Sequence, residues 1–278
     1  MLIHRVILLA AAWWPISAAI ASAERGTVAA DAASCRALSG EHISPVVELY
    51  TSEGCSSCPP ADRWLASFAD TDDAISLAFH VDYWDYIGWK DRFASPRFSA
   101  RQRARVNQAG GRVTYTPQVM VGSQVQVDWR SPGKLRQALQ EAAGPAALQL
   151  SLASQRSPEM LQIDVELSAK LHGGEEKAKS AAQSELWVAL LEDGLESAVT
   201  AGENDGRTLR HQRVVRQWLG PYPISRQQPR WQGQLKWQSE WNPARMRVVS
   251  LLEDENTHET LAAVELALGD CPASKSGQ

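Results

Sequence analysis

Two cysteines, Cys55 and Cys58, stand where a short apolar run gives way to a stretch with a helical spacing of apolar residues. The run from Val46 to Tyr50 has the length of a buried strand, and the apolar residues from Trp64 to Phe68 recur at helical intervals. Free amide groups and the positive dipole end at a helix N-terminus favour a thiolate over a thiol. The pattern therefore predicts Cys55 as an exposed, attacking sulfur and Cys58 as the resolving sulfur that closes the internal disulfide.

A Cys-x-x-Cys motif is also half of a zinc site, and its cysteines can form a purely structural disulfide. The two remaining cysteines, Cys35 and Cys271, do not make a second close pair, and no two histidines have zinc-ligand spacing. We therefore favour a redox use of the motif and expect no cofactor. A structural disulfide is the main alternative.

The N-terminus is typical of a signal peptide. Arg5 precedes an apolar run from Val6 to Ile20, and Ala21-Ser22-Ala23 provides a small-x-small cleavage pattern. A spanning helix needs ~20 apolar residues, and Pro15 interrupts this run, so we expect no membrane span in the mature chain. Residues 1–23 are predicted to be removed, which places the mature protein in the periplasm or outside the cell.

Such compartments are oxidising, and disulfides persist in them. Cys35 and Cys271 lie near the two ends of the mature chain and are predicted to form a disulfide, with two free thiols as the alternative. The formal net charge of −4 provides no basic footprint for nucleic acid. A chain of 278 residues has room for two domains.

Residues 24–43 are rich in alanine, serine and charge, and we interpret them as a loose leader. The first domain, residues 44–145, is predicted to alternate strands and helices. Its strands are expected at 44–50, 74–81 and 113–121 with a hairpin strand at 125–129, and its helices at about 60–69, 96–108 and 132–143. The helix over 96–108 carries four arginines and is expected to be exposed and basic.

A proline lies within the expected strand at 113–121. Pro117 cannot donate to a strand ladder, so its place needs a reason, and a cis Thr116–Pro117 bond at the strand entry would supply one. The aromatic and acidic segment from Asp82 to Asp91, which includes Trp84, follows the buried strand at 74–81. Loops in this position often bind ligands, although a packed loop is an equal alternative.

This order of elements, with Cys-x-x-Cys after the first strand and a proline at a later strand entry, resembles the thioredoxin fold. The resemblance implies Cys55 as nucleophile, Cys58 as resolving thiol and Pro117 as a cis proline beside them. Tyr115, Thr116 and Trp84 become the candidate substrate-binding residues. The chain departs from well-known members in having Ser56-Ser57 between the cysteines and Pro59-Pro60 after them.

A second resemblance is closer, and it is to a secreted family called domain of unknown function 1223. It extends over about residues 45–220 and implies the compartment and the fold, but leaves the reaction open. The motifs that carry it are Glu48 to Asp62, His80 to Asp85 with Gly88-Trp89, Tyr115 to Gln118, and Gly202-Glu203-Asn204 with Gly206-Arg207.

The second domain, residues 146–270, is predicted to be rich in strands, and two packed antiparallel sheets fit their spacing. The strands are expected at 148–153, 160–168, 185–192, 208–218, 230–237, 245–253 and 259–267. The turn at 202–206 carries acids beside Asn204, which suggests calcium, but the spacing is not that of a known calcium loop. A capped turn with a surface ion pair is favoured.

The expected fold is thus an α/β thioredoxin-like N-terminal domain followed by an all-β sandwich-like domain. The expected function is that of a periplasmic or secreted thiol–disulfide oxidoreductase whose partners are protein thiols or disulfides. One alternative is a soft-metal site for an ion such as Cu(I), in which His80 or Met120 joins the two cysteines. The other is a non-catalytic interaction module stiffened by the disulfide.

Overall fold

The computed structural model describes residues 35–69, 71, 73–169, 184–225, 227–269 and 271. The expected signal peptide and the start of the expected leader lie outside the described residues. The rest of the expected leader is not loose, because it forms the strands β1 (Cys35–Leu38) and β2 (His42–Ile43). No helix in the described part of the chain has the length and apolar character that crossing a membrane requires.

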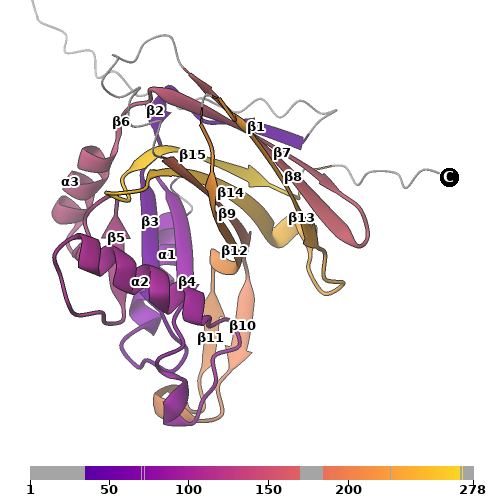
Figure 1. Ribbon diagram of the computed structural model, residues 1–278. Coiled ribbons are helices and arrows are strands. Elements are labelled where there is room, and N and C mark those ends of the chain that lie inside the picture. The colour runs from indigo at the N-terminus through magenta and orange to yellow at the C-terminus, as the bar shows by residue number, and fades with distance from the viewer. Residues whose placement is uncertain are drawn as a thin grey trace, which may run out of the picture.

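A seven-stranded mixed sheet crosses the molecule in the order β15-β14-β9-β12-β4-β3-β5 (Figure 1). Three of its strands come from the first half of the chain and four from the second half. The strands are β3 (Val46–Thr51), β4 (Ile75–His80), β5 (Gln118–Val121), β9 (Ser184–Glu192), β12 (Val214–Pro223), β14 (Met246–Asp254) and β15 (Thr260–Ala267).

The expectation of a thioredoxin-like domain followed by a separate β sandwich is therefore wrong. β4 pairs in parallel with β3 on one side and with β12 on the other, where Val214 is the partner of Ala78. β12 in turn pairs antiparallel with β9. Every residue of β4 is buried, so both edges and both faces of this strand need neighbours, and the second half of the chain supplies some of them.

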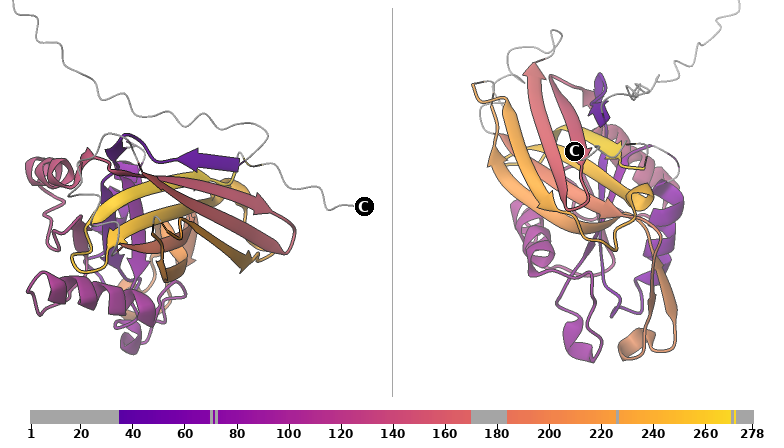
Figure 2. Two further views of the ribbon diagram at one scale, coloured as in Figure 1. Left: turned by 45° about the horizontal axis from the view of Figure 1, so that its top comes forward. Right: turned by 90° about the vertical axis from the view of Figure 1, so that its right-hand side faces the viewer.

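A second, antiparallel sheet has the order β1-β7-β8-β13 and packs on the C-terminal strands of the large sheet (Figure 2). Its further strands are β7 (Leu148–Arg156), β8 (Met160–Ala169) and β13 (Arg230–Lys236). Leu148, Leu150 and Leu152 alternate with more exposed residues and share one core with Leu186 and Val188 of β9. The two sheets thus pack face to face, but one of them also holds β3, β4 and β5, so the expected separate sandwich domain does not exist.

Helices cover both faces of the N-terminal strands. α1 (Pro59–Ala69) and α3 (Pro132–Ala142) share a core on one face, and α2 (Pro96–Gln108) packs on the other. α1 begins at Pro59, where a proline costs no hydrogen bond because the first amides of a helix have no partner within it. Two further pairs, β2 with β6 (Gly144–Pro145) and β10 (Leu195–Ala198) with β11 (Thr208–His211), complete the strands.

The basic helix α2 is only partly exposed, because Arg97 and Arg103 face solvent but the other two arginines do not. Arg101 and Arg105 are buried and form ion pairs of 2.6 Å with Glu48, and Arg101 forms another with Glu253. Burial raises the pKa of the Glu48 carboxyl, but the two arginines outweigh burial and lower it to about 2. Because Glu253 comes from the far end of the chain, sequence reasoning had no way to assign these arginines an inner partner.

Two local expectations are confirmed and two are wrong. Cys35 and Cys271 form a disulfide, and the Thr116–Pro117 bond is cis. The strand expected at 113–121 begins only at Gln118, and the hairpin expected at 125–129 is reduced to one bridge between Val121 and Gln124.

Candidate functional site: the Cys55–Cys58 disulfide

Cys55 and Cys58 are joined by a disulfide across the turn between β3 and α1. The turn is held by its own backbone, since the Cys55 amide donates to Ser52 O at 3.2 Å and the Cys58 amide donates to Cys55 O at 3.2 Å. The carbonyl of Cys58 accepts from the amides of Ala61 at 2.8 Å and Asp62 at 3.1 Å. Cys58 therefore stands at the start of the helix, and Cys55 precedes it by one turn of chain.

Both cysteines are fully buried, whereas Ser56 and Ser57 between them are exposed. The expectation of an exposed Cys55 is therefore wrong. Outside the disulfide, the polar neighbour of the Cys55 sulfur is Ser57 Oγ at 3.3 Å. Two segments remote in sequence pack around the turn: the loop of Trp84, which the sequence predicted to bind here, and the segment 202–204, which it did not.

The first of these segments is the aromatic loop that holds η1 (Asp85–Ile87). A Cβ on Gly54 would lie 3.1 Å from Trp84 Cβ and 3.2 Å from Ile87 Cδ1, so the loop packs directly against the residue before Cys55. Trp84 Nε1 donates to Thr116 Oγ1 at 2.7 Å. Trp84 thus connects the disulfide turn to the Thr116–Pro117 segment.

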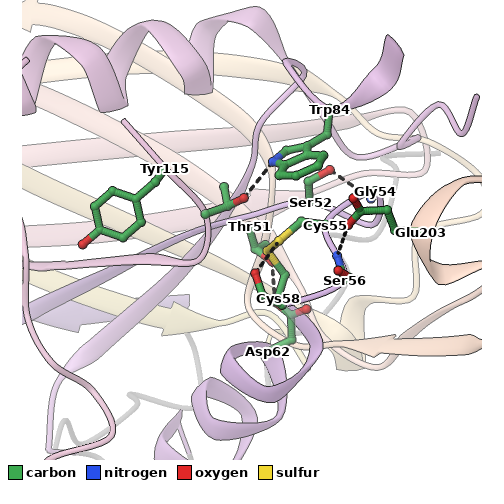
Figure 3. The surroundings of a disulfide bond; sticks show 12 residues. Thr51, Ser52, Gly54, Cys55, Ser56, Cys58, Asp62, Trp84, Tyr115 and Glu203 are labelled. Carbon is green, nitrogen blue, oxygen red and sulfur yellow. Dashed lines mark hydrogen bonds between the residues drawn. A yellow bond between two sulfur atoms is a disulfide. The ribbon is translucent and has the colours of Figure 1, made fainter. Parts of the chain in front are cut away.

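Tyr115 does not join this group. It is 41% exposed, and Figure 3 shows it apart from the disulfide with its ring directed away. Of the residues predicted from the sequence, the structure therefore brings together the two cysteines, Trp84 and Thr116, while Tyr115 faces solvent beside them.

The second segment is η2 (Gly202–Asn204), which connects β10 to β11 and comes from the other half of the chain. Asn204 Nδ2 donates to the carbonyls of Glu53 at 2.8 Å and Cys55 at 3.0 Å. Glu203 Oε2 accepts from the amide of Ser56 at 3.1 Å (Figure 3). We call the pair of Glu203 and Asn204 the clamp. Gly202 is required here because its φ is +74° and a Cβ would lie 3.2 Å from Ile87 Cδ1.

The interpretation of the turn at 202–206 as a capped turn with a surface ion pair missed the clamp. Asn204 is buried, and its side-chain amide is used on a turn 149 residues away in sequence. Among the described residues, no three or more His, Cys, Asp or Glu side chains are grouped to hold a metal ion. In the sequence, only the motif Gly202-Glu203-Asn204 of the family resemblance pointed to these residues, and it did not indicate which part of the chain they contact.

A buried pair of His80 and Asp91 adjoins the turn. His80 Nδ1 lies 2.7 Å from Asp91 Oδ2, and the same oxygen accepts from the amide of Glu53 at 2.9 Å. Burial lowers the pKa of His80, but the contact with Asp91 more than offsets burial and raises that pKa above its usual value. Burial raises the pKa of Asp91, but the contact with His80 more than offsets burial and lowers that pKa below its usual value. An ionised Asp91 thus holds the backbone two residues before Cys55.

Glu53 is itself part of a second pair, with His211 of β11. His211 Nε2 lies 3.2 Å from Glu53 Oε1 without the alignment of a hydrogen bond, and Trp89 Nε1 donates to Glu53 Oε2 at 2.8 Å. Burial raises the pKa of Glu53, but the contact with His211 and the bond from Trp89 contribute to lowering it below its usual value. The imidazoles of His80 and His211 are 5.0 Å apart in an edge-to-face arrangement.

Asp62 is the first acid after the cysteines in the sequence. It is buried in the first turn of α1, and Thr51 Oγ1 donates to its carboxylate at 2.7 Å (Figure 3). Burial raises the pKa of Asp62, and the nearby His211 and His80 offset only part of that rise. Asp62 is therefore a buried carboxyl that takes up a proton more readily than an exposed one.

The comparisons with known proteins concern the same elements. One family model, described as "Protein of unknown function (DUF1223)", matches residues 46–253, which is more than half of the chain. The chain belongs to the DUF1223 family. The matched range of this DUF1223 protein includes the disulfide turn, the aromatic loop and the clamp. No curated protein matches it.

Two solved structures resemble this DUF1223 protein over most of its length. A protein from Agrobacterium tumefaciens has 21% identity and a TM-score of 0.54, and the match covers 86% of this chain and 98% of that one. HBP35 of Porphyromonas gingivalis has 14% identity and a TM-score of 0.58, with 86% and 80% covered. At these identities the likeness concerns the fold.

Proposed function

We propose that this protein is a periplasmic or secreted thiol–disulfide oxidoreductase that exchanges electrons with protein thiols or disulfides through Cys55 and Cys58. The observation that carries the proposal is the disulfide across the turn into α1, with one cysteine before the helix and the other at its first turn. Such a pair can open and close with little change elsewhere in the fold. The two disulfides of the described chain support an oxidising compartment.

In the reducing direction, the Cys55 thiolate attacks one sulfur of a substrate disulfide, and the other substrate sulfur leaves as a thiolate. The Cys58 thiol then loses its proton and attacks the Cys55 sulfur, which reforms the internal disulfide and releases the second substrate thiol. Asp62 is our candidate for accepting that proton, because its amide bonds to Cys58 O and its carboxyl pKa is raised by burial. The oxidising direction is the same sequence of steps in reverse.

The Thr116–Pro117 segment and Trp84 are proposed to position the partner backbone. The hydrogen bond from Trp84 to Thr116 pins this segment beside the turn, and Trp84 touches the residue before Cys55. Tyr115, which points away from the disulfide, would then meet the partner beyond the reacting bond and add apolar contact.

A second candidate is a non-catalytic module in which the disulfide only stiffens the turn. The full burial of both cysteines favours it, because exchange requires access to a sulfur. The soft-metal alternative has no such support, since His80 is bonded to Asp91 and Met120 is packed within the core under α2.

Trapping separates the two candidates. With Cys58→Ala, Cys55 is left without its resolving partner and should accumulate mixed disulfides with protein substrates in the periplasmic fraction, visible as bands that reductant removes. Cys55→Ala keeps one thiol in the same turn and serves as the matched control, which should trap nothing. Equal trapping by both variants, or by neither, would favour the stiffened module over the oxidoreductase.

A further inference from the structure

Glu203 accepts a hydrogen bond from a backbone amide that could otherwise donate to a Cys55 thiolate. The first amide after Cys55 belongs to Ser56, and it donates to Glu203 Oε2 at 3.1 Å. The amide of Cys58 is also engaged, with Cys55 O. Free amides near the start of a helix normally supply the positive field that stabilises a thiolate, and in this turn, which precedes α1, the amides of Ser56 and Cys58 are directed to other oxygens.

Two acidic side chains, Glu203 and Glu53, flank the turn, and the nearby His80 and His211 are directed to Asp91 and Glu53. Glu203 is exposed and its bond to Ser56 lowers its carboxyl pKa, while Glu53, two residues before Cys55, also has a lowered pKa. Within the described residues, no lysine, arginine or histidine side chain forms a hydrogen bond to either sulfur of the pair. A thiolate formed at Cys55 would therefore receive no hydrogen bond from a cationic side chain of the described residues and would share its turn with the carboxylate of Glu203.

We propose that Glu203 is a positioning residue that keeps the Cys55–Cys58 couple at a reducing potential. Its carboxylate holds the Ser56 amide and places negative charge on the turn in which the thiolate of the reduced form must develop. Stabilising the thiolate makes a dithiol pair a strong oxidant, so withholding that stabilisation favours the disulfide and makes the dithiol a strong reductant. The inference rests on the proposed redox function.

Electron flow follows from this assignment. The dithiol form passes two electrons to a substrate disulfide, which is broken into two thiols, while the Cys55–Cys58 disulfide forms. To act again, the protein must regain two electrons and two protons from the dithiol of an electron-donor protein. The substrate class is then a protein disulfide that needs reduction or rearrangement.

The test is the Glu203→Gln variant, which keeps an oxygen for the Ser56 amide and removes only the charge. Asp205→Asn is the matched control, because Asp205 is an exposed acid of the same connection whose side chain forms no hydrogen bond or ion pair with the described residues of the turn. Two quantities are measured on full-length protein: the equilibrium constant against dithiothreitol or glutathione buffers, and the alkylation rate of Cys55 against pH. The pH midpoint of alkylation reports the charge around Cys55, whereas a merely structural loosening of the turn would change the alkylation rate at every pH.

With Glu203→Gln we expect a lower Cys55 pKa and an equilibrium shifted about three- to tenfold toward the dithiol, where tenfold corresponds to ~30 mV for this two-electron couple. Added salt should reduce the difference in Cys55 pKa between Glu203→Gln and wild type, because Glu203 is exposed and its charge is screened. Equal values for Glu203→Gln, Asp205→Asn and wild type would overturn the role of Glu203 and leave the redox function standing. A wild-type disulfide that is reduced only on unfolding would overturn both.

Discussion

Removing the Asn204 side chain tests whether the clamp holds the two halves of the molecule together. Asn204 is buried, and its Nδ2 donates to the carbonyls of Glu53 and Cys55 at 2.8 and 3.0 Å. In Asn204→Ala both acceptors lose this donor. A buried acceptor left without a partner costs about 1–3 kcal/mol.

The total cost of leaving both carbonyls without this donor is less than the sum of the two separate costs. The carbonyl of Cys55 still accepts from the Cys58 amide, and the neighbouring Ser56 and Glu203 are exposed, so water can approach from that side. We therefore expect Asn204→Ala to lower the free energy of unfolding by about 2–3 kcal/mol. Because the turn is then less covered, the Cys55–Cys58 disulfide should also be reduced faster by a small dithiol.

Urea unfolding followed by tryptophan fluorescence measures the first effect, and the rate of thiol release measures the second. Arg207→Ala is the matched control: it removes a 3.1 Å bond to Asn204 Oδ1 from an exposed arginine and should change stability by less than about 1 kcal/mol. If Asn204→Ala matches this control in both stability and reduction rate, the clamp does not hold the turn and the reasoning fails.

Two further predictions concern the rest of the fold. Replacing both Cys35 and Cys271 with serine should lower the free energy of unfolding in urea by about 4–5 kcal/mol, because chain-entropy loss scales with so long a loop; a change under about 1 kcal/mol would contradict the entropic reasoning. The pair of His80 and Asp91 should make stability depend on pH at both ends. Because the pKa of His80 is raised, its contribution to the free energy of unfolding is fully present below pH 6.5 and is lost as the pH rises through the pKa of His80 in the folded protein. Because the pKa of Asp91 is lowered, its contribution is present above pH 3.8 and is lost as the pH falls through the pKa of Asp91 in the folded protein. Unfolding measured across pH should show both slopes, and His80→Gln should flatten the upper one.

Local patterns were enough to predict much of this protein. Apolar runs and helical spacing located β3, α1, β4, α2 and α3 within a few residues, since each buries a face that its own sequence must supply. The same holds for the disulfide of Cys35 with Cys271 and the cis bond before Pro117, which follow from the leftover cysteines and from the missing ladder donor.

What the tertiary structure decided is how the two halves meet. The pairing of Val214 with Ala78 joins the predicted domains into one sheet, and no residue pattern in either strand specifies that neighbour. The burial of Arg101, which looked like surface charge, depends on Glu253 at the other end of the chain. The pattern of apolar residues along a strand indicates which of its faces are buried, but it does not indicate which element covers them.

The candidate site divides in the same way. Cys55 and Cys58 were found from spacing alone, because a reactive pair has to lie close together in sequence. Their burial and the clamp of Glu203 and Asn204 come from contacts between residues 147 and 149 positions apart. An asparagine amide and a carboxylate act on whatever backbone the fold brings within hydrogen-bond distance, so only the folded chain reveals which turn they hold.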